Sequence, residues 1–225
     1  MQIVESRWHG QEFVSLSGEG STGTPAEQLE QLLDQAEAAL AKLSLTLEAV
    51  VLTRFWIRER GPGEDIRSVR SRRLTGLHRS ATSTFYSETH FMGPGQVAID
   101  LIALKHPIPE SRRLVDFDPP RRYAHYQMHN GWLFASGMAE VAPDPESQFV
   151  ALFAQLELAL NSEGKGWEDV ILARIYTEKG FAERTWALDR LLSAIPGEPP
   201  EMITAETVSG LASTNKNLEI EIIAK

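Results

Sequence analysis

Two carboxylates near the end of the chain have a spacing that could support chemistry. Glu219 and Glu221 alternate with apolar residues in the run Leu218-Glu-Ile-Glu-Ile-Ile-Ala224, and this alternation predicts a β-strand. Because side chains two apart on a strand share a face, both acids lie on one face and the apolar residues between them on the other. A buried carboxylate without a partner is costly or shifts its pKa. The acids therefore face either a wet, ligand-bearing cleft or basic residues of another module, and both interpretations stay open.

A glutamate in such a cleft could act as a general base toward water if its surroundings raised its pKa toward neutrality. An arginine beside it could anchor a substrate carboxylate, because the planar guanidinium matches that group at two points. Arg121 and Arg122, next to Tyr123, are the first candidates. A second candidate is a cluster of arginines, for which a solvated or interface-pairing helix face is the favoured interpretation. Its members are Arg58, Arg60, Arg67, Arg70, Arg72, Arg73 and Arg79.

The histidines do not predict a metal site. His125 and His129 share a face of a predicted strand, but four residues of strand separate them by ~13 Å. His9, His78 and His90 have no carboxylate or cysteine at ligand spacing, and the chain contains no cysteine at all. We expect neither a metal nor another cofactor.

Charge and hydropathy limit the kind of partner. The 225 residues carry a formal charge of -9, which makes nucleic acid an unlikely partner. No apolar run approaches the ~20 residues needed to cross a bilayer, and the first residues lack the features of a secretory signal. We therefore expect a cytoplasmic protein with no membrane contact.

The sequence contains an internal duplication. Residues 25–57 align without gaps to residues 145–177 at a constant offset of 120, with eleven identities in thirty-three positions. The flanks repeat as well, since Ser17-Gly18 recurs as Ser136-Gly137 and Val97–Ala103 recurs as Leu218–Ala224. We divide the chain into a module at 1–107, a proline-rich linker at 108–120 and a second module at 121–225.

Each copy is predicted to run strand, strand, helix, strand, helix, strand. The first helices begin at Pro25 and Pro145, each directly after a residue that can cap a helix. The runs Val50–Ile57 and Val170–Thr177 are rich in β-branched and aromatic residues, as expected of strands in a covered sheet. The second helices are predicted near residues 65–76 and 181–195.

These features together resemble the RidA/YjgF family, also called the endoribonuclease L-PSP family, in both halves. The residues that carry the resemblance in copy two are Trp132-Leu-Phe-Ala-Ser-Gly137, Trp167-Glu-Asp-Val-Ile-Leu-Ala-Arg-Ile-Tyr176 and the terminal Leu218-Glu-Ile-Glu221. Copy one matches through Phe13–Gly18, Leu47–Arg54 and Val97–Asp100. The resemblance implies an α+β fold of two chorismate mutase-like modules, each a mixed β-sheet with two helices packed on one face. It also implies assembly in threes, with small-molecule sites in the clefts between neighbouring sheets.

The resemblance also implies a site. Family deaminases hold the substrate carboxylate with an arginine in a turn before the terminal strand, and the strand's glutamate positions the attacking water. Here the corresponding turns are 81–84 and 201–204, with Thr82 and Met202 in the place of the arginine. Copy one has Ala98 in the place of the glutamate, whereas copy two keeps Glu219 and, upstream, Tyr123.

From this pattern we expect Glu219 and Tyr123 to be catalytic. The residues expected to bind the ligand are Arg121, Arg122, Met202, Thr204 and Thr82. The expected function is binding of a small carboxylate-bearing metabolite, with possible hydrolysis of an imine or enamine at a site that lacks the family arginine. The alternative is a non-catalytic metabolite-sensing or protein-interaction module. We expect a homotrimer that holds six modules in two rings.

Overall fold

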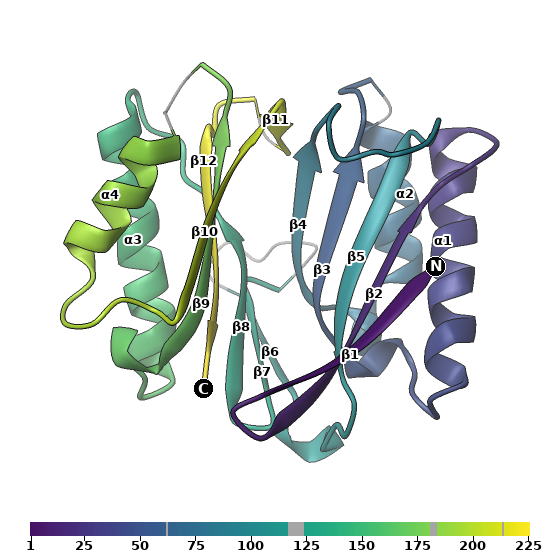
Figure 1. The fold of residues 1–225 in the computed structure, drawn as a ribbon, viewed down its shortest axis with the longest axis horizontal. Coiled ribbons are helices and arrows are strands. Elements are labelled where there is room, and N and C mark those ends of the chain that lie inside the picture. The colour runs from purple at the N-terminus through teal and green to yellow at the C-terminus, as the bar shows by residue number, and fades with distance from the viewer. Residues whose placement is uncertain (62, 117–123, 181–183, 213) are drawn as a thin grey trace.

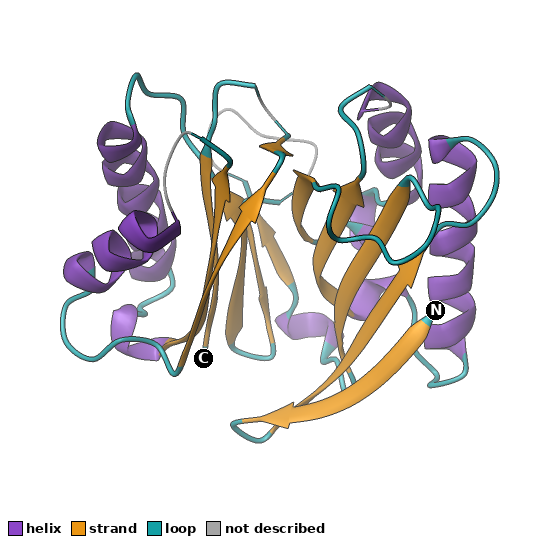
Figure 2. Ribbon diagram, turned by 45° about the horizontal axis from the view of Figure 1, so that its top comes forward, coloured by secondary structure: helices purple, strands orange, loops and turns teal. Residues whose placement is uncertain are grey.

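The computed structural model describes residues 1–61, 63–116, 124–180, 184–212 and 214–225. It contains two six-stranded sheets, each with helices on one face (Figures 1 and 2). The first half contributes β1 (Gln2–Trp8), β2 (Gln11–Glu19), α1 (Pro25–Ala41), β3 (Val50–Ile57), α2 (Gly63–Arg73), β4 (Ala81–Tyr86) and β5 (Val97–Leu104). The second half contributes β6 (Arg113–Val115), β7 (Tyr126–His129), β8 (Trp132–Met138), α3 (Pro145–Ser162), β9 (Val170–Glu178), α4 (Arg184–Ala194), β10 (Met202–Val208), β11 (Gly210–Leu211) and β12 (Leu218–Ala224).

The duplication is visible in three dimensions. Helices α1 and α3 start at Pro25 and Pro145, and strands β3 and β9 start at Val50 and Val170, so the offset of 120 holds for both pairs. The strand order β1-β2-β5-β3-β4 of the first sheet recurs as β7-β8-β12-β9-β10 in the second. The fold confirms the predicted α+β class with two modules.

Each copy contains one strand more than expected. We expected the segments 81–84 and 201–204 to be turns, but residues 81–84 belong to β4 and residues 202–204 to β10. These strands run parallel to β3 and β9. Their sequences, Ala-Thr-Ser-Thr-Phe-Tyr and Met-Ile-Thr-Ala-Glu-Thr-Val, are rich in β-branched and aromatic residues, which favour a sheet over a turn. The second helices lie close to their expected places, although residues 181–183 are outside the described part of the chain.

Strands near the boundary between the modules belong to the sheets, so the modules are joined by more than a linker. Arg113–Val115, in the segment expected as a connector, forms β6 and pairs with β7 at the edge of the second sheet. In the other direction, β11 comes from the second half of the sequence but pairs with β4 of the first sheet. Each sheet thus ends in a strand that lies outside the repeated pattern.

The two sheets face each other, and the helices cover their outer faces (Figure 1). One apolar core packs β2, β3 and β5 against α1 and α2, and a second packs β8, β9 and β12 against α3 and α4. Two further apolar clusters join the sheets. One includes Phe13, Phe134 and Ile223, and the other includes Trp56, Phe85 and Tyr176. The space between the sheets is therefore a packed interface that also holds the polar groups described below.

Candidate functional site

Strand alternation places the two carboxylates as predicted. On β12, Leu218, Ile220 and Ile222 belong to the core beneath α3 and α4. Glu219 and Glu221 are on the opposite face, toward the first sheet, where they are 5% and 0% exposed. One face of this strand meets the helices, as expected of a sheet with helices packed on one side, and the other face meets the sheet of the first module.

Glu221 pairs with a basic residue of the other module. The Nε atom of Arg54, on β3, donates to Oε2 of Glu221 at 2.7 Å, and the two side chains are 3% and 0% exposed. Burial works to lower the pKa of Arg54, but Glu221, Tyr176 and Asp100 together outweigh it and the pKa is raised. For Glu221 the structure thus shows ion pairing rather than an open cleft.

The Arg54–Glu221 pair belongs to a larger group that we call the inter-sheet polar cluster. Its members are Arg54, Asp100, Arg174, Tyr176, Glu206 and Glu221. Within each sheet an arginine lies opposite an acid, Arg54 beside Asp100 and Arg174 beside Glu221. The duplication relates these two pairs to each other, so the cluster unites equivalent positions of both copies.

The cluster contains buried polar atoms without a hydrogen-bond partner among the described residues. They are Nη2 of Arg54, Nε of Arg174 and Oε1 of Glu221. Buried polar groups in proteins are nearly always hydrogen-bonded, to the protein, to water or to a ligand. Two of these atoms are cationic donors and one is an anionic acceptor. The arrangement is complementary to a small polar molecule that has both an acceptor and a donor.

Ionisation in the cluster is shifted by its surroundings. Burial and the nearby carboxylate of Glu221 raise the pKa of Tyr176, so its hydroxyl keeps its proton at neutral pH. Glu206 is exposed as a residue, yet desolvation of its carboxyl group raises its pKa against the opposing effect of Arg174. The cluster can therefore offer a protonated phenol and a carboxyl group of increased basicity.

A histidine forms the rim of the cluster. His90 stacks on Trp56 with ring centroids 3.7 Å apart, and its Nε2 atom is 3.8 Å from a carboxylate oxygen of Asp100. Trp56 Nε1 donates to that oxygen at 2.7 Å. Burial lowers the pKa of His90, although Asp100 opposes the shift. No carboxylate is at ligand spacing from His90 in the sequence, and Asp100 comes near it because the fold places β5 beside the loop that carries His90.

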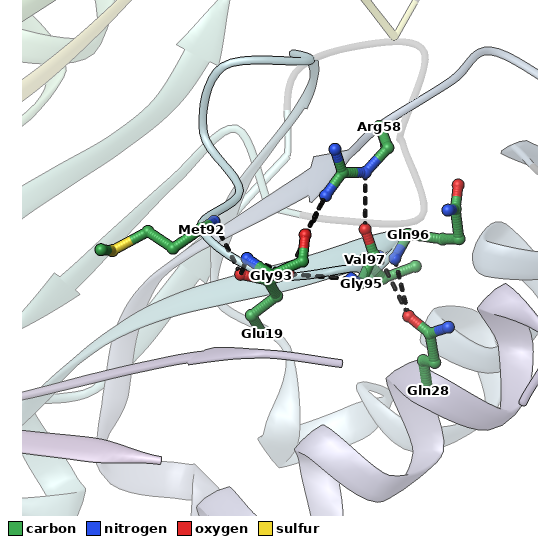
Figure 3. Close-up of polar contacts among 8 residues, drawn as sticks. All are labelled: Glu19, Gln28, Arg58, Met92, Gly93, Gly95, Gln96 and Val97. Atoms are coloured by element: carbon green, nitrogen blue, oxygen red, sulfur yellow. Dashed lines mark hydrogen bonds and ion pairs between the residues drawn. The ribbon is translucent and has the colours of Figure 1, made fainter. Parts of the chain in front are cut away.

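Side chains of β2, α1 and the end of β3 hold the segment that follows His90, residues 92–97 (Figure 3). The Glu19 carboxylate accepts N–H hydrogen bonds from Met92, Gly93 and Gly95 at 2.8–3.1 Å. Arg58 donates to the carbonyl oxygens of Gly93 and Gly95 at 2.6 and 2.7 Å. Gln28 accepts the next two backbone N–H groups along the chain. These contacts hold the loop that presents His90 to Trp56.

Glu219 lies beside the cluster on β12. It is opposite Tyr176 in the ladder between β12 and β9. Its carboxyl group packs against Gly137, where an added Cβ would lie 1.5 Å from Oε1. The backbone N–H of Gly137 donates to Oγ of Ser83 on β4 of the first module, at 2.8 Å. Glu219 is therefore enclosed at the interface by residues of both halves.

Thr82 is on the wrong face to contact a ligand there. Its Oγ1 donates to the carbonyl of Ser80, and its neighbours Ala81 and Phe85, at odd-numbered positions of β4, face the other sheet. The ladders pair Ala81 with Leu52 and Met202 with Leu172, so Ala81, not Thr82, is equivalent to Met202. A slip of one residue reverses the face on which a strand side chain lies.

The other predicted ligand contacts divide into two groups. Met202 and Thr204 lie in register with Leu172 and Arg174, on the face of β10 turned toward the first sheet. Met202 also lines a pocket of about 320 Å³ together with Trp8 and Leu172. Tyr123, Arg121 and Arg122 lie outside the described residues.

The arginine cluster of the first module forms ion pairs. Arg73 binds Glu30, Asp34 and Glu37 on α1, and Arg60 reaches Glu178 of the second module. The interpretation that these arginines pair with acids on a helix face or across the interface is confirmed for Arg60 and Arg73.

No group of three histidine or acidic side chains within the described ranges is placed to hold a metal.

The comparisons with known proteins concern the fold. No protein-family model and no curated protein matches the sequence. Among solved structures, a chorismatase is similar over 99% of this chain and 77% of its own length, with 14% identity and a TM-score of 0.70. This chain has a chorismatase-like fold. The likeness extends over both modules and is one of architecture.

Solved structures of the YjgF family are each similar to about half of this chain. A member of the YjgF/YER057c/UK114 family from Mycobacterium tuberculosis covers 51% of this chain and 98% of its own, with 20% identity and a TM-score of 0.46. A YjgF family protein from Neisseria meningitidis covers 50% of this chain and 92% of its own, with 23% identity and a TM-score of 0.43.

No helix in the described part of the chain is long and apolar enough to cross a membrane.

Proposed function

We propose that this protein binds a small carboxylate-bearing metabolite at the inter-sheet polar cluster. The observation that carries the proposal is the pair of equivalent arginines, Arg54 and Arg174, each with a buried nitrogen that has no hydrogen-bond partner in the described chain. Guanidinium N–H groups in a buried site bind a carboxylate strongly. Arg174 is the better anchor, because Arg54 already forms an ion pair with Glu221. In this proposal, these arginines bind the ligand carboxylate, as the family arginine does, because Met202 and Thr82 occupy the place of that arginine and cannot.

The acids around the arginines narrow the ligand class. Asp100, Glu206 and Glu221 give the cluster more carboxyl groups than guanidinium groups. A simple anion would be repelled by them, whereas a molecule with a carboxylate at one end and an N–H donor at the other would satisfy both. An imine or enamine derived from an amino acid has these two groups. Met202 and Thr204, on the same face of β10, are further candidate contacts.

Hydrolysis is the reaction that these groups would support. In the proposed step, water adds to the carbon of the C=N bond while Glu219 accepts a proton from that water. Glu219 then passes that proton to the nitrogen. The C–N bond breaks as the new hydroxyl group gives its proton to the departing nitrogen, so ammonia leaves and a 2-oxo acid remains. Tyr123 stays a proposed participant outside the described residues, together with Arg121 and Arg122 as ligand contacts. The chorismatase-like fold makes chorismate, another carboxylate, a second compound to assay.

Binding is tested first, by titration calorimetry with 2-aminobutanoate, a stable compound that has both a carboxylate and N–H donors, and with chorismate. The Arg174→Met variant is expected to bind the accepted ligand at least about tenfold more weakly, since a charge-assisted hydrogen bond is lost. Arg67→Met is the matched control, because Arg67 pairs with Glu64 on the surface of α2. Equal affinity of wild type and Arg174→Met, or no binding of either compound, contradicts the proposal.

Turnover is tested separately, with imines generated from amino acids in situ. Glu219→Gln is expected to lower the hydrolysis rate at least about a hundredfold if the carboxylate is the base. An unchanged rate would remove Glu219 from the reaction. Binding without any turnover in the wild type would favour the metabolite-sensing alternative.

A further inference from the structure

A second pocket lies away from the inter-sheet polar cluster, where the two modules and the connector meet. It has a volume of about 260 Å³. One wall is formed by residues 44–46, 48 and 49, just before β3, and another by Leu77, Pro107 and Pro109. His129 of β7 and Arg112 of the connector complete the lining. The pocket thus combines apolar walls with two nitrogen-bearing side chains.

Both of these side chains have a buried nitrogen without a hydrogen-bond partner in the residues described. They are Nε of Arg112 and Nε2 of His129, and His129 is fully buried. Another nitrogen atom of each side chain does have a hydrogen-bond contact. Arg112 donates through Nη2 to the carbonyl of Arg79, and the amide nitrogen of Gln127 lies 3.4 Å from Nδ1 of His129. Sequence analysis gave no role to Arg112 or to His129.

The contact with Gln127 determines what His129 can offer. An amide NH₂ group only donates, so Nδ1 accepts and the ring proton of the neutral imidazole is on Nε2. Burial and the Arg112 cation lower the pKa of His129 to about 4, although the backbone of Ile108 opposes the shift. His129 is therefore neutral at pH 7 and has a donor at Nε2. Arg112 supplies a second donor at Nε.

Charges near the pocket also favour an anion of modest size. Glu48 lines the pocket and partly balances Arg112, while Arg79, which lies next to Arg112, is paired with Asp116. Burial lowers the pKa of Arg112, which shows that its charge is poorly solvated. A single negative charge between Arg112 and His129 would compensate for this. Leu45, Leu77 and the two prolines would surround an apolar body.

We propose that this pocket is a second ligand site, which takes a small monocarboxylate with an apolar body whose oxygens accept from Arg112 and His129. The ligand class differs from that of the inter-sheet polar cluster, since no N–H donor is required of the ligand. The apolar walls favour such a carboxylate over inorganic phosphate. The proposal does not depend on any activity at the inter-sheet polar cluster.

The experiment is a titration of the full chain with benzoate, followed by ¹⁵N NMR of the histidine ring nitrogens and by calorimetry. We expect the Nε2 signal of His129 to shift with a single saturation curve. Arg112→Met is expected to weaken benzoate binding at least about tenfold. Arg113→Met, which removes the neighbouring exposed arginine, and Arg174→Met should bind benzoate as the wild type does.

Three results would overturn the proposal. They are an unchanged affinity in Arg112→Met, loss of binding in Arg174→Met, and equal binding of inorganic phosphate. If Arg112→Met does not fold, the wild-type titration decides, because benzoate that leaves the His129 signal unmoved is bound elsewhere or not at all.

Discussion

Arg54 and Glu221 form a buried ion pair that joins the two modules. Removal of one partner leaves an uncompensated charge in the interface, whereas removal of both leaves none. We therefore expect the pair to add little net stability compared with apolar residues in its place.

Arg54→Met is expected to lower the free energy of unfolding by ~3–5 kcal/mol, while the double variant Arg54→Met/Glu221→Leu recovers most of that loss. Urea unfolding followed by tryptophan fluorescence measures both. A double variant as unstable as the single one would show that the pair contributes through its attraction, not through the cost of a lone charge.

At the residue scale, the sequence predicted the faces of β12 correctly but not the partners of its acids. Alternation in Leu218–Ala224 is a local property, so the face of Glu221 follows from it. Arg54 is 167 positions away, and no local pattern connects the two. Thr82 was misplaced because an alignment by spacing slipped by one residue, which is sufficient to reverse a strand face.

At the element scale, the loop that carries His90 depends on the Glu19 carboxylate. Burial works to raise the pKa of Glu19, but hydrogen bonds from Gly93, Gly95 and Met92 outweigh it, and the pKa lies below its usual value of 4.5. A group with a depressed folded-state pKa stabilises the fold above its unfolded pKa. That contribution is lost as the pH falls through the folded-state value.

Glu19→Gln is therefore expected to loosen the loop at pH 7, and the difference from wild type should narrow as the pH falls below about 4.5. Hydrogen exchange of the amides of Met92, Gly93 and Gly95 measures the effect directly, with the Glu27→Gln variant as a control at another carboxylate. Equal protection in Glu19→Gln and wild type at pH 7 would show that the loop is held by other contacts.

The helices were predictable because their signals are local and repeated. Thr24 and Glu27 form a capping box, and Asp144 accepts from the N–H of Ser147. The residues that begin α1 and α3 can therefore be recognised from the sequence. Strands β4 and β10 were missed because their threonines and serines also suit turns. Their pairing with β3 and β9 is set by tertiary structure, which local sequence patterns do not contain.

At the scale of the whole molecule, most of the architecture could be predicted from the duplication in the sequence. Two copies of one pattern predict two copies of one module, and the two sheets share a strand order. The facing of the sheets and the exchange of β11 into the first sheet could not be predicted, because these depend on contacts between the copies. The inter-sheet polar cluster arises from those contacts, so it could not be predicted from the sequence either.

Assembly remains a prediction at this scale. We expect three chains of 25.1 kDa each to associate, because the family that the sequence resembles assembles in threes. Sedimentation equilibrium at several concentrations would give the mass. A single species with the mass of one or two chains would contradict the homotrimer.

The central claim is that the inter-sheet polar cluster binds a small carboxylate through Arg174. The most direct measurement is an NMR titration of protein labelled with ¹⁵N at the arginine Nε atoms, with 2-aminobutanoate, which has a carboxylate and N–H donors, as the ligand. We predict that the Nε signal of Arg174 shifts to saturation while that of Arg67 stays in place. If the Arg174 signal does not move, or if only the signal of Arg112 moves, the cluster is a structural feature of the interface and the account is wrong.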